Sequence, residues 1–221
     1  MKNTTHSSPD AFGSTLESDQ AATKSVLTYS ALNTFRNCPR KYKHRYIDCL
    51  RPREKPEALS FGSVIHGAIE LWYQSAANGN RLRAILDFID QQFPKRIGDD
   101  AQKAAWHLAR AMFTGYASCY PDENFEVVEV EKSFIGEIRN PDTGRPSQTF
   151  VMAGKVDAIV KRPDGMYLLE HKTASTIDAS YLDKLWTDTQ IALYSHYLRQ
   201  LGYRMKRRGS FPRCRTTNTS P

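Results

Sequence analysis

Long hydrophobic runs are absent from this chain of 221 residues. A membrane-spanning helix needs about 20 consecutive apolar residues, so no membrane partner is expected. The first two dozen residues are polar and rich in serine and threonine, without the apolar segment that secretion signals carry. The sequence therefore predicts a disordered leader over residues 1–24 and a cytoplasmic location.

Cysteine is scarce and scattered, with 4 residues and no pair at Cys-x-x-Cys spacing. A chain of this length without a secretion signal does not depend on a disulfide framework, so most of these cysteines are expected to be reduced thiols. Structural zinc sites use closely spaced cysteine and histidine. The spacing here excludes a zinc-dependent protein.

Acidic residues are too few to balance the chain, whose net charge is +7. Six basic residues and no acidic one lie in residues 204–221, however, and the remaining 25 basic and 24 acidic residues almost cancel. Global charge is therefore a weak argument for nucleic-acid binding. Residues 204–221 also lack apolar periodicity and predict a basic irregular tail, for which a native ending and a frame error in the gene are both open explanations.

Residues 25–203 predict one domain that changes from helical to strand periodicity along its length. Ser30 is expected to cap the first helix, and Pro39 fits the first turn of the second. Helices are expected at residues 31–37, 39–48, 61–75, 80–93 and 101–120. Strands are expected at residues 125–138, 148–161 and 166–172, before one amphipathic helix at 180–201. This order predicts an α/β fold, a small mixed sheet flanked by helices with a helical N-terminal region.

Two acidic residues lie on either side of a tight turn between two expected strands. Asp157 is within the second strand, and Glu170 ends the third. Facing side chains of antiparallel strands lie about 5 Å apart, so these carboxylates can share a Mg²⁺ or Mn²⁺ ion, which prefers oxygen ligands. Lys172 falls on the same strand face as Glu170. The intervening His171 would offer its backbone carbonyl to the metal while its side chain faces away.

The same segment also fits a surface hairpin with a solvated Glu–Lys pair, because short patterns of this kind are common. Its context favours a site. Residues 167–169 have the character of a buried strand, which ends abruptly in three polar residues. Such a change places the polar residues at an edge or mouth of the sheet.

Two helical segments carry further candidates. His66 lies among small and apolar residues, and Glu70 follows one turn later, where it can orient the ring or add a carboxylate. In the last helix, Gln190 and Tyr194 share a face and can hydrogen-bond to a phosphate or a base. A histidine satisfied in the core and an ordinary amphipathic boundary remain the alternatives for these two segments.

A basic and aromatic stretch covers residues 36–55, where eight lysine and arginine residues face only two acidic ones. Tyrosine and histidine alternate with the basic residues, as suits contact with phosphates and stacking on exposed bases. A solvated charged face is the alternative. The candidate DNA-binding residues here are Arg36, Arg40, Lys41, Lys43 and Arg45.

Five segments, taken in order, resemble the RecB-like branch of the PD-(D/E)XK nuclease superfamily, which includes CRISPR-associated and phage exonucleases. They are residues 29–42, 61–66, 154–157, 169–173 and 190–194. The resemblance implies a restriction-endonuclease-like core with Gln190 and Tyr194 near the DNA. The metal-binding, catalytic and auxiliary residues that it implies are His66, Asp157, Glu170, Lys172 and Glu131.

Some members of this branch hold an iron–sulfur cluster with one cysteine before the nuclease core and three after it. Cys38 occupies the first position, but only Cys214 follows the core. Because a cluster normally needs four thiolates, no iron–sulfur cluster is expected, and Cys38 is expected to be a packing residue.

The sequence thus favours a divalent-metal-dependent DNA nuclease, an exonuclease of DNA recombination, repair or processing. Its partners would be DNA and a recombination, helicase or annealing protein. The alternative is a catalytically impaired, nuclease-like module that binds DNA or a partner protein, which the unusual residues 204–221 favour.

Overall fold

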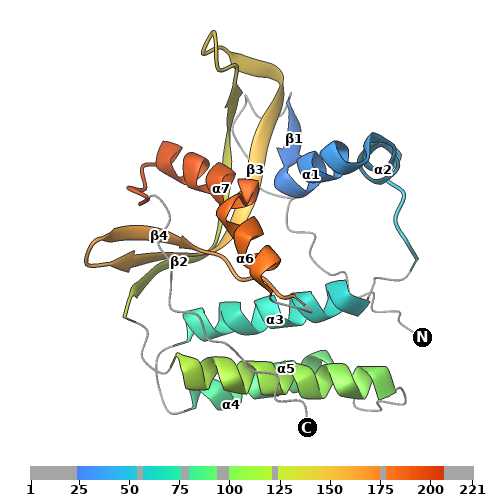
Figure 1. Ribbon diagram of the computed structural model, residues 1–221, viewed down its shortest axis with the longest axis vertical. Coiled ribbons are helices and arrows are strands. Elements are labelled where there is room, and N and C mark those ends of the chain that lie inside the picture. Colours follow the sequence, from blue (N-terminus) through green and yellow to red (C-terminus); the bar gives the residue numbers. More distant parts are fainter. Residues whose placement is uncertain are drawn as a thin grey trace, which may run out of the picture.

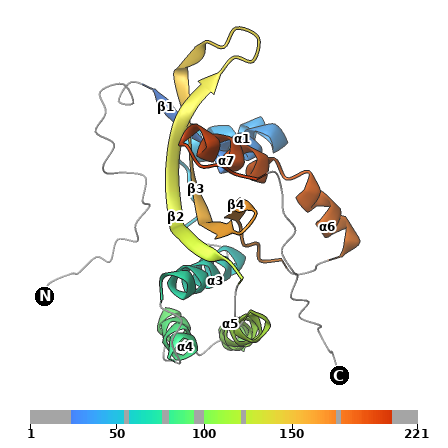
Figure 2. The same ribbon diagram turned by 90° about the vertical axis from the view of Figure 1, so that its left-hand side faces the viewer.

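The computed structural model describes residues 24–53, 57–75, 80–93, 100–120, 124–174 and 178–206. A mixed sheet has helices against one face and a layer of three helices at one end (Figures 1 and 2). The α/β fold class expected from the sequence is confirmed. Nearly all of the expected leader and most of the expected tail lie outside the described residues.

The sheet is built around one long strand, β3 (Pro146–Arg162). Strands β2 (Glu126–Arg139) and β4 (Gly165–Leu169) pair with it in antiparallel fashion, which confirms the three expected strands in outline. A fourth strand, β1 (Ser25–Thr28), pairs with β3 in parallel. The set of three expected strands was therefore incomplete, because the four residues of β1 are too few to show a strand period.

Strand β2 follows one edge of β3, and β1 and β4 share the other edge. β1 pairs with residues 150–153 and β4 with residues 158–162 of β3. Residues 154–157 therefore lie between the two shorter strands. Asp157 is the last of these four residues, next to the point where β4 ends.

Helices α3 (Glu57–Gln74), α4 (Arg81–Gln92) and α5 (Asp100–Cys119) form the layer at the end of the sheet (Figure 2). Their apolar faces enclose a core that includes Trp72 and Phe113, whose ring centroids are 5.6 Å apart. This confirms the three expected helices. α3 carries His66 towards the end of β3 that holds Asp157.

Two short helices and one wider turn follow β1: α1 (Tyr29–Asn37), α2 (Pro39–Tyr42) and the π-helix η1 (Lys43–Ile47). Pro39 occupies the first turn of α2 as expected. The N-cap of α1 is Thr28 rather than Ser30, since the Thr28 hydroxyl accepts the Ala31 N–H at 3.2 Å. Ser30 is already inside the helix.

The single helix expected at 180–201 is two helices, α6 (Ala179–Trp186) and α7 (Thr189–Gln200). Asp188 separates them by capping α7, its Oδ1 accepting the Gln190 N–H at 2.8 Å. α7 lies close to the sheet because Gly154 has no side chain. A Cβ there would overlap the Phe134 ring and lie 2.9 Å from the Tyr194 ring.

The remaining expectations are met unevenly. Among the described cysteines, Cys38 and Cys49 are free thiols, in line with the expectation for most of them, and Cys119 is disulfide-bonded. Met205 is buried and forms a parallel bridge with Met166 of β4, within the stretch expected to be an irregular tail. In the described part of the chain, no helix is both long and apolar enough to cross a membrane.

Candidate active site

Three acidic residues, which we call the acidic row, lie on β2, on β3 and directly after β4. Glu131 lies on β2 between two residues that pair with residues 158 and 156 of β3, so it stands opposite Asp157. On the other side, the last β3–β4 pair joins residues 158 and 169, and Glu170 follows one residue later. The tight β3–β4 turn thus places Glu170 beside Asp157 in the register of the two segments, and the charge of Asp157 acts on Glu170.

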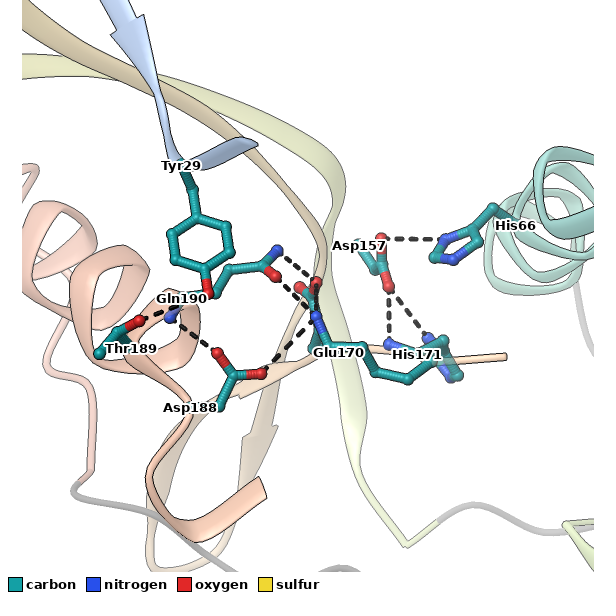
Figure 3. Close-up of polar contacts among 9 residues, drawn as sticks. Tyr29, His66, Asp157, Glu170, His171, Asp188, Thr189 and Gln190 are labelled. Atoms are coloured by element: carbon teal, nitrogen blue, oxygen red, sulfur yellow. Dashed lines mark hydrogen bonds and ion pairs between the residues drawn. The ribbon is translucent and has the colours of Figure 1, made fainter. Parts of the chain in front are cut away.

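Asp157 is largely buried and is held on both of its oxygens (Figure 3). Oδ2 accepts the backbone N–H of His171 at 2.7 Å, and Oδ1 lies 3.3 Å from Nδ1 of His66. Burial alone would raise the pKa of the Asp157 carboxyl. The contacts with His171 and His66 outweigh burial and hold that pKa well below its ordinary value, so the carboxylate is ionised.

His66 reaches Asp157 from α3, with 38% of its side chain exposed. Its hydrogen bond to Asp157 raises the pKa of the imidazole, and the charges of Asp157, Glu170 and Glu131 act in the same direction against burial. His66 therefore lies in direct contact with Asp157. Its role as a metal ligand stays a prediction.

His171 departs from the sequence expectation. Strand β4 ends at Leu169, so residues 170–172 lie beyond the strand, and the His171 amide finds the Asp157 carboxylate as its acceptor. The His171 side chain does not face away. Its Nδ1 is 3.6 Å from Asp157 Oδ2, and its ring lies between those of Tyr73 and Tyr116, at centroid distances of 5.8 and 6.1 Å. These two tyrosines, which sequence reasoning missed, hold the turn after β4 against the helical layer.

Glu170 has only 9% of its side chain exposed. Its Oε1 accepts hydrogen bonds from Gln190 Nε2 at 2.7 Å and from Lys172 Nζ at 3.2 Å. Its Oε2 is buried without a hydrogen-bond partner. Burial, followed by the negative charge of Asp157, raises the pKa of the Glu170 carboxyl to about 7.

Lys172 is fixed by three groups rather than by Glu170 alone. Its Nζ donates to Gln190 Oε1 at 2.6 Å and lies 3.8 Å from Asp188 Oδ2. Gln190 therefore bridges the Glu170 carboxylate and the Lys172 ammonium. The sequence did not predict this role. Asp188 was missed altogether, although the run of Thr, Asp and Thr at residues 187–189 is typical of a helix start.

Tyr194 lies one turn beyond Gln190 and is buried in the core, with 7% exposed. Its ring is edge-on to Phe134, 5.1 Å between centroids. Burial, followed by the charge of Glu170, raises the pKa of the Tyr194 hydroxyl to about 12. The DNA contact expected for Gln190 and Tyr194 stays a prediction, and the Tyr194 ring packs in the core against Phe134.

The two auxiliary acids differ in position. Glu131 has a positive φ of 53°, a conformation that non-glycine residues rarely adopt and that occurs more often at functional sites, and its carboxylate pairs with Lys155. Glu70 accepts a hydrogen bond from Gln74 at 3.0 Å, whereas the His66 ring is oriented by Asp157. The auxiliary roles of Glu131 and Glu70 stay predictions.

The basic residues expected to bind DNA lie on α1, α2 and η1, away from the acidic row. They are all exposed: Arg36, Arg40, Lys41, Lys43 and Arg45. Lys43 pairs with Asp48 at 2.9 Å. Cys38 is exposed and caps α2, its sulfur accepting the Lys41 N–H at 3.4 Å, so the expectation of a packing role was wrong.

The donor set of the site suits a hard divalent cation. In the described ranges, no three His, Cys, Asp or Glu side chains are grouped as a ready-made metal site. Magnesium, however, is commonly bound through only one or two carboxylates and keeps several waters. Asp157 and Glu170 supply two, and the buried, unpartnered Oε2 of Glu170 is an oxygen that a cation would satisfy.

Comparison with known proteins agrees with this geometry. The family description that matches the chain is the PD-(D/E)XK nuclease superfamily, over residues 26–217. The match includes the acidic row, Lys172 and the α7 residues. The curated proteins contain no match.

Proposed function

The chain belongs to the PD-(D/E)XK nuclease superfamily, and on that premise we propose that it is a divalent-metal-dependent deoxyribonuclease that hydrolyses phosphodiester bonds. One observation carries the proposal. An ionised carboxylate, Asp157, stands beside Glu170, whose buried Oε2 has no partner, with the Lys172 ammonium alongside.

Asp157 and Glu170 would hold the Mg²⁺ or Mn²⁺ that members of this superfamily typically use, with the His171 backbone carbonyl and His66 as further candidate ligands. Such a cation, when bound, acidifies a water and neutralises charge on the scissile phosphate. Glu170 must be ionised to take part, and Lys172 favours that form through its positive charge.

Lys172 would act on the substrate rather than bind the metal. Its side chain is 31% exposed, while Gln190 and Asp188 restrict the position of the ammonium. It can therefore face substrate, where it would orient the attacking water or stabilise negative charge on the phosphate. Holding a catalytic group in place in this way reduces the entropy cost of reaching the transition state.

The finer assignment rests on the resemblance to RecB-like nucleases. Under this assignment the protein is an exonuclease. It would act in DNA recombination, repair or processing, together with a recombination, helicase or annealing protein.

Digestion of end-labelled linear DNA and of circular DNA, each with Mg²⁺, Mn²⁺ or a chelator, tests the proposal. Cleavage is expected only with metal, and an exonuclease would spare the circle. Lys172→Ala should abolish cleavage, while Lys161→Ala, which removes an exposed lysine that pairs with Glu126 near the C-terminal end of β3, should not. Cleavage by Lys172→Ala at the wild-type rate would contradict the assigned role. Binding of DNA without cleavage by the wild type would support the nuclease-like binding module instead.

A further inference from the structure

We propose that the surface of α1, α2 and η1 binds single-stranded DNA and leads it to the acidic row, an inference that rests on the proposed nuclease function. The aromatic platform, defined as Phe35, Tyr42 and Tyr46, carries this proposal together with the basic residues around it. It would give the enzyme a preference for single strands or unpaired ends.

The three rings of the platform form a continuous row. The Phe35 ring meets the Tyr42 ring edge-on at 5.4 Å, and the Tyr42 and Tyr46 rings are stacked at 5.3 Å with 30° between their planes. The Arg45 guanidinium lies 5.6 Å from the centre of the Tyr46 ring. Exposed bases stack on such rings and on arginine, whatever their sequence.

Phe35 marks the open end of the row, because half of its surface, 50%, is exposed. An aromatic side chain of this size usually lies in the core. Phe35 instead packs on Tyr42 of the next helix, which fixes its ring without covering it. The row continues into the π-helical turn η1, a form of helix that occurs frequently at functional sites.

Charge around the platform favours a polyanion. Arg36, Arg40 and Lys41 are exposed, and no ion pair joins any of them to an acidic side chain within the described residues. Lys43 and His44 are occupied by Asp48. A second copy of the chain would bring the same positive charges against these, whereas a nucleic-acid strand brings phosphates to the cations and bases to the rings.

The platform is joined to the active site through α1. Tyr29 begins this helix, and its hydroxyl accepts a hydrogen bond from Thr189, the neighbour of Gln190, at 3.4 Å (Figure 3). From Tyr29 to Phe35 the helix rises about 9 Å at 1.5 Å per residue. A single strand is more extended than a strand of a duplex, which rises about 3.4 Å per phosphate, so this part of the path spans at most about three nucleotides. A strand on the platform can therefore reach the acidic row.

Single strands are favoured over duplexes because stacking requires an uncovered base face. In a duplex the bases are already stacked on one another and paired, so only the phosphates remain for the basic residues. The platform then adds affinity for single strands alone, and the arginines and lysines contribute to both forms.

Fluorescence anisotropy tests this with the full-length chain, a labelled oligothymidylate and a labelled duplex, in a chelator that prevents cleavage. Phe35→Ala and Tyr46→Ala should each weaken single-strand binding roughly 5- to 100-fold, and duplex binding far less. Phe35→Leu should weaken it to a similar extent, whereas a packing role predicts rescue by leucine. Because Phe35 is half exposed, its variants remain informative if Tyr46→Ala does not fold.

The charge component has its own readout. Arg40→Gln should lower the slope of log affinity against log salt by about 0.7, the value for one phosphate contact on a single strand. Arg83→Gln, an exposed arginine of α4, is the matched control and should change neither slope nor affinity. Unchanged single-strand affinity in Phe35→Ala would overturn the proposal, as would a change in oligomeric state with normal DNA binding.

Failure here is distinct from failure of the nuclease proposal. A wild type that binds single strands through the platform but cuts no DNA with metal contradicts only the nuclease function. A wild type that cuts DNA while the platform variants bind normally contradicts only the platform.

Discussion

The two halves of the active site treat their carboxylates in opposite ways. On the α3 side, both oxygens of Asp157 face nitrogen atoms of His66 and His171, and the pKa of this carboxyl is lowered. On the α7 side, Glu170 is partnered on one oxygen only, and its pKa is raised to about 7. Neighbouring acids with pKa values pushed apart are typical of functional sites.

The two halves therefore differ in how well the protein itself stabilises an ionised carboxylate. We call the Asp157 side the prepared half and the Glu170 side the unprepared half. The Asp157 half is complete in the protein itself, because its donors already stabilise the negative charge. The Glu170 half has a buried oxygen with no donor, so its charge needs a further positive partner. A divalent cation shared by the two carboxylates would meet that need.

Breaking the prepared half should have the largest effect. The Asp157 carboxyl is ionised at ordinary pH because its pKa is lowered. Asp157→Asn removes this negative charge and keeps the shape of the side chain. Loss of one cation ligand is expected to lower DNA cleavage by about 10³-fold, equivalent to several kcal/mol of transition-state stabilisation. The measurement is kcat/KM with Mg²⁺, with the melting temperature recorded alongside.

Asp164→Asn is the matched control, since Asp164 lies in the β3–β4 turn and bonds to Tyr167. It should cleave like the wild type. An Asp157→Asn enzyme within tenfold of the wild type would show that the prepared half is dispensable.

The unprepared half should reveal itself through pH. With a chelator present, the folded protein retains the Glu170 proton up to pH about 7, whereas in the unfolded chain this group titrates near 4.5. The folded state then binds more protons, so stability is fully present below pH 4.5 and falls as pH rises through 7. Relative to Glu170→Gln, the wild type should lose about 2 kcal/mol of unfolding free energy between pH 5 and 8.

Urea unfolding at a series of pH values measures this loss, and Mg²⁺ at saturating concentration should reduce it. The unfolding free energies of the wild type and of Glu170→Gln, measured in the chelator, could instead change in parallel with pH. Ionising Glu170 would then not destabilise the folded protein, and the contrast between the two halves would fail.

The bridge between Glu170 and Lys172 should show the smallest effect. Gln190→Ala removes both side-chain hydrogen bonds but leaves the two charges in contact. Cleavage is expected to fall about tenfold, the lower end for groups that orient metal ligands. Steady-state kinetics compare it with Gln200→Ala, an exposed glutamine at the end of the same helix. A rate unchanged by Gln190→Ala would assign the positioning of Lys172 to Asp188.

The centre of the site could be predicted because it depends on a local feature. A tight turn between two antiparallel strands fixes which residues face each other, so Asp157 and Glu170 had to meet once the strands were recognised. The approach of His66 followed from the same family pattern.

The surroundings depended on contacts that no local pattern specifies. Strand β1 is only four residues long and gains its partners from β3, far along the chain. The break at Asp188 was hidden because the apolar spacing continues on both sides of it, and only the cap geometry separates α6 from α7. The inward direction of the His171 ring depends on Tyr73 of α3 and Tyr116 of α5, so it could not be derived from strand alternation.

Titration of the chain with Mn²⁺ by calorimetry, at pH 8 and without DNA, tests most directly whether Asp157 and Glu170 hold one cation together. Binding is predicted for the wild type and for Glu126→Gln, which alters an exposed acid on β2. It should be lost in both Asp157→Asn and Glu170→Gln. Unchanged Mn²⁺ affinity in both variants would contradict the account, because the two halves of the site would then have no shared ion to join them.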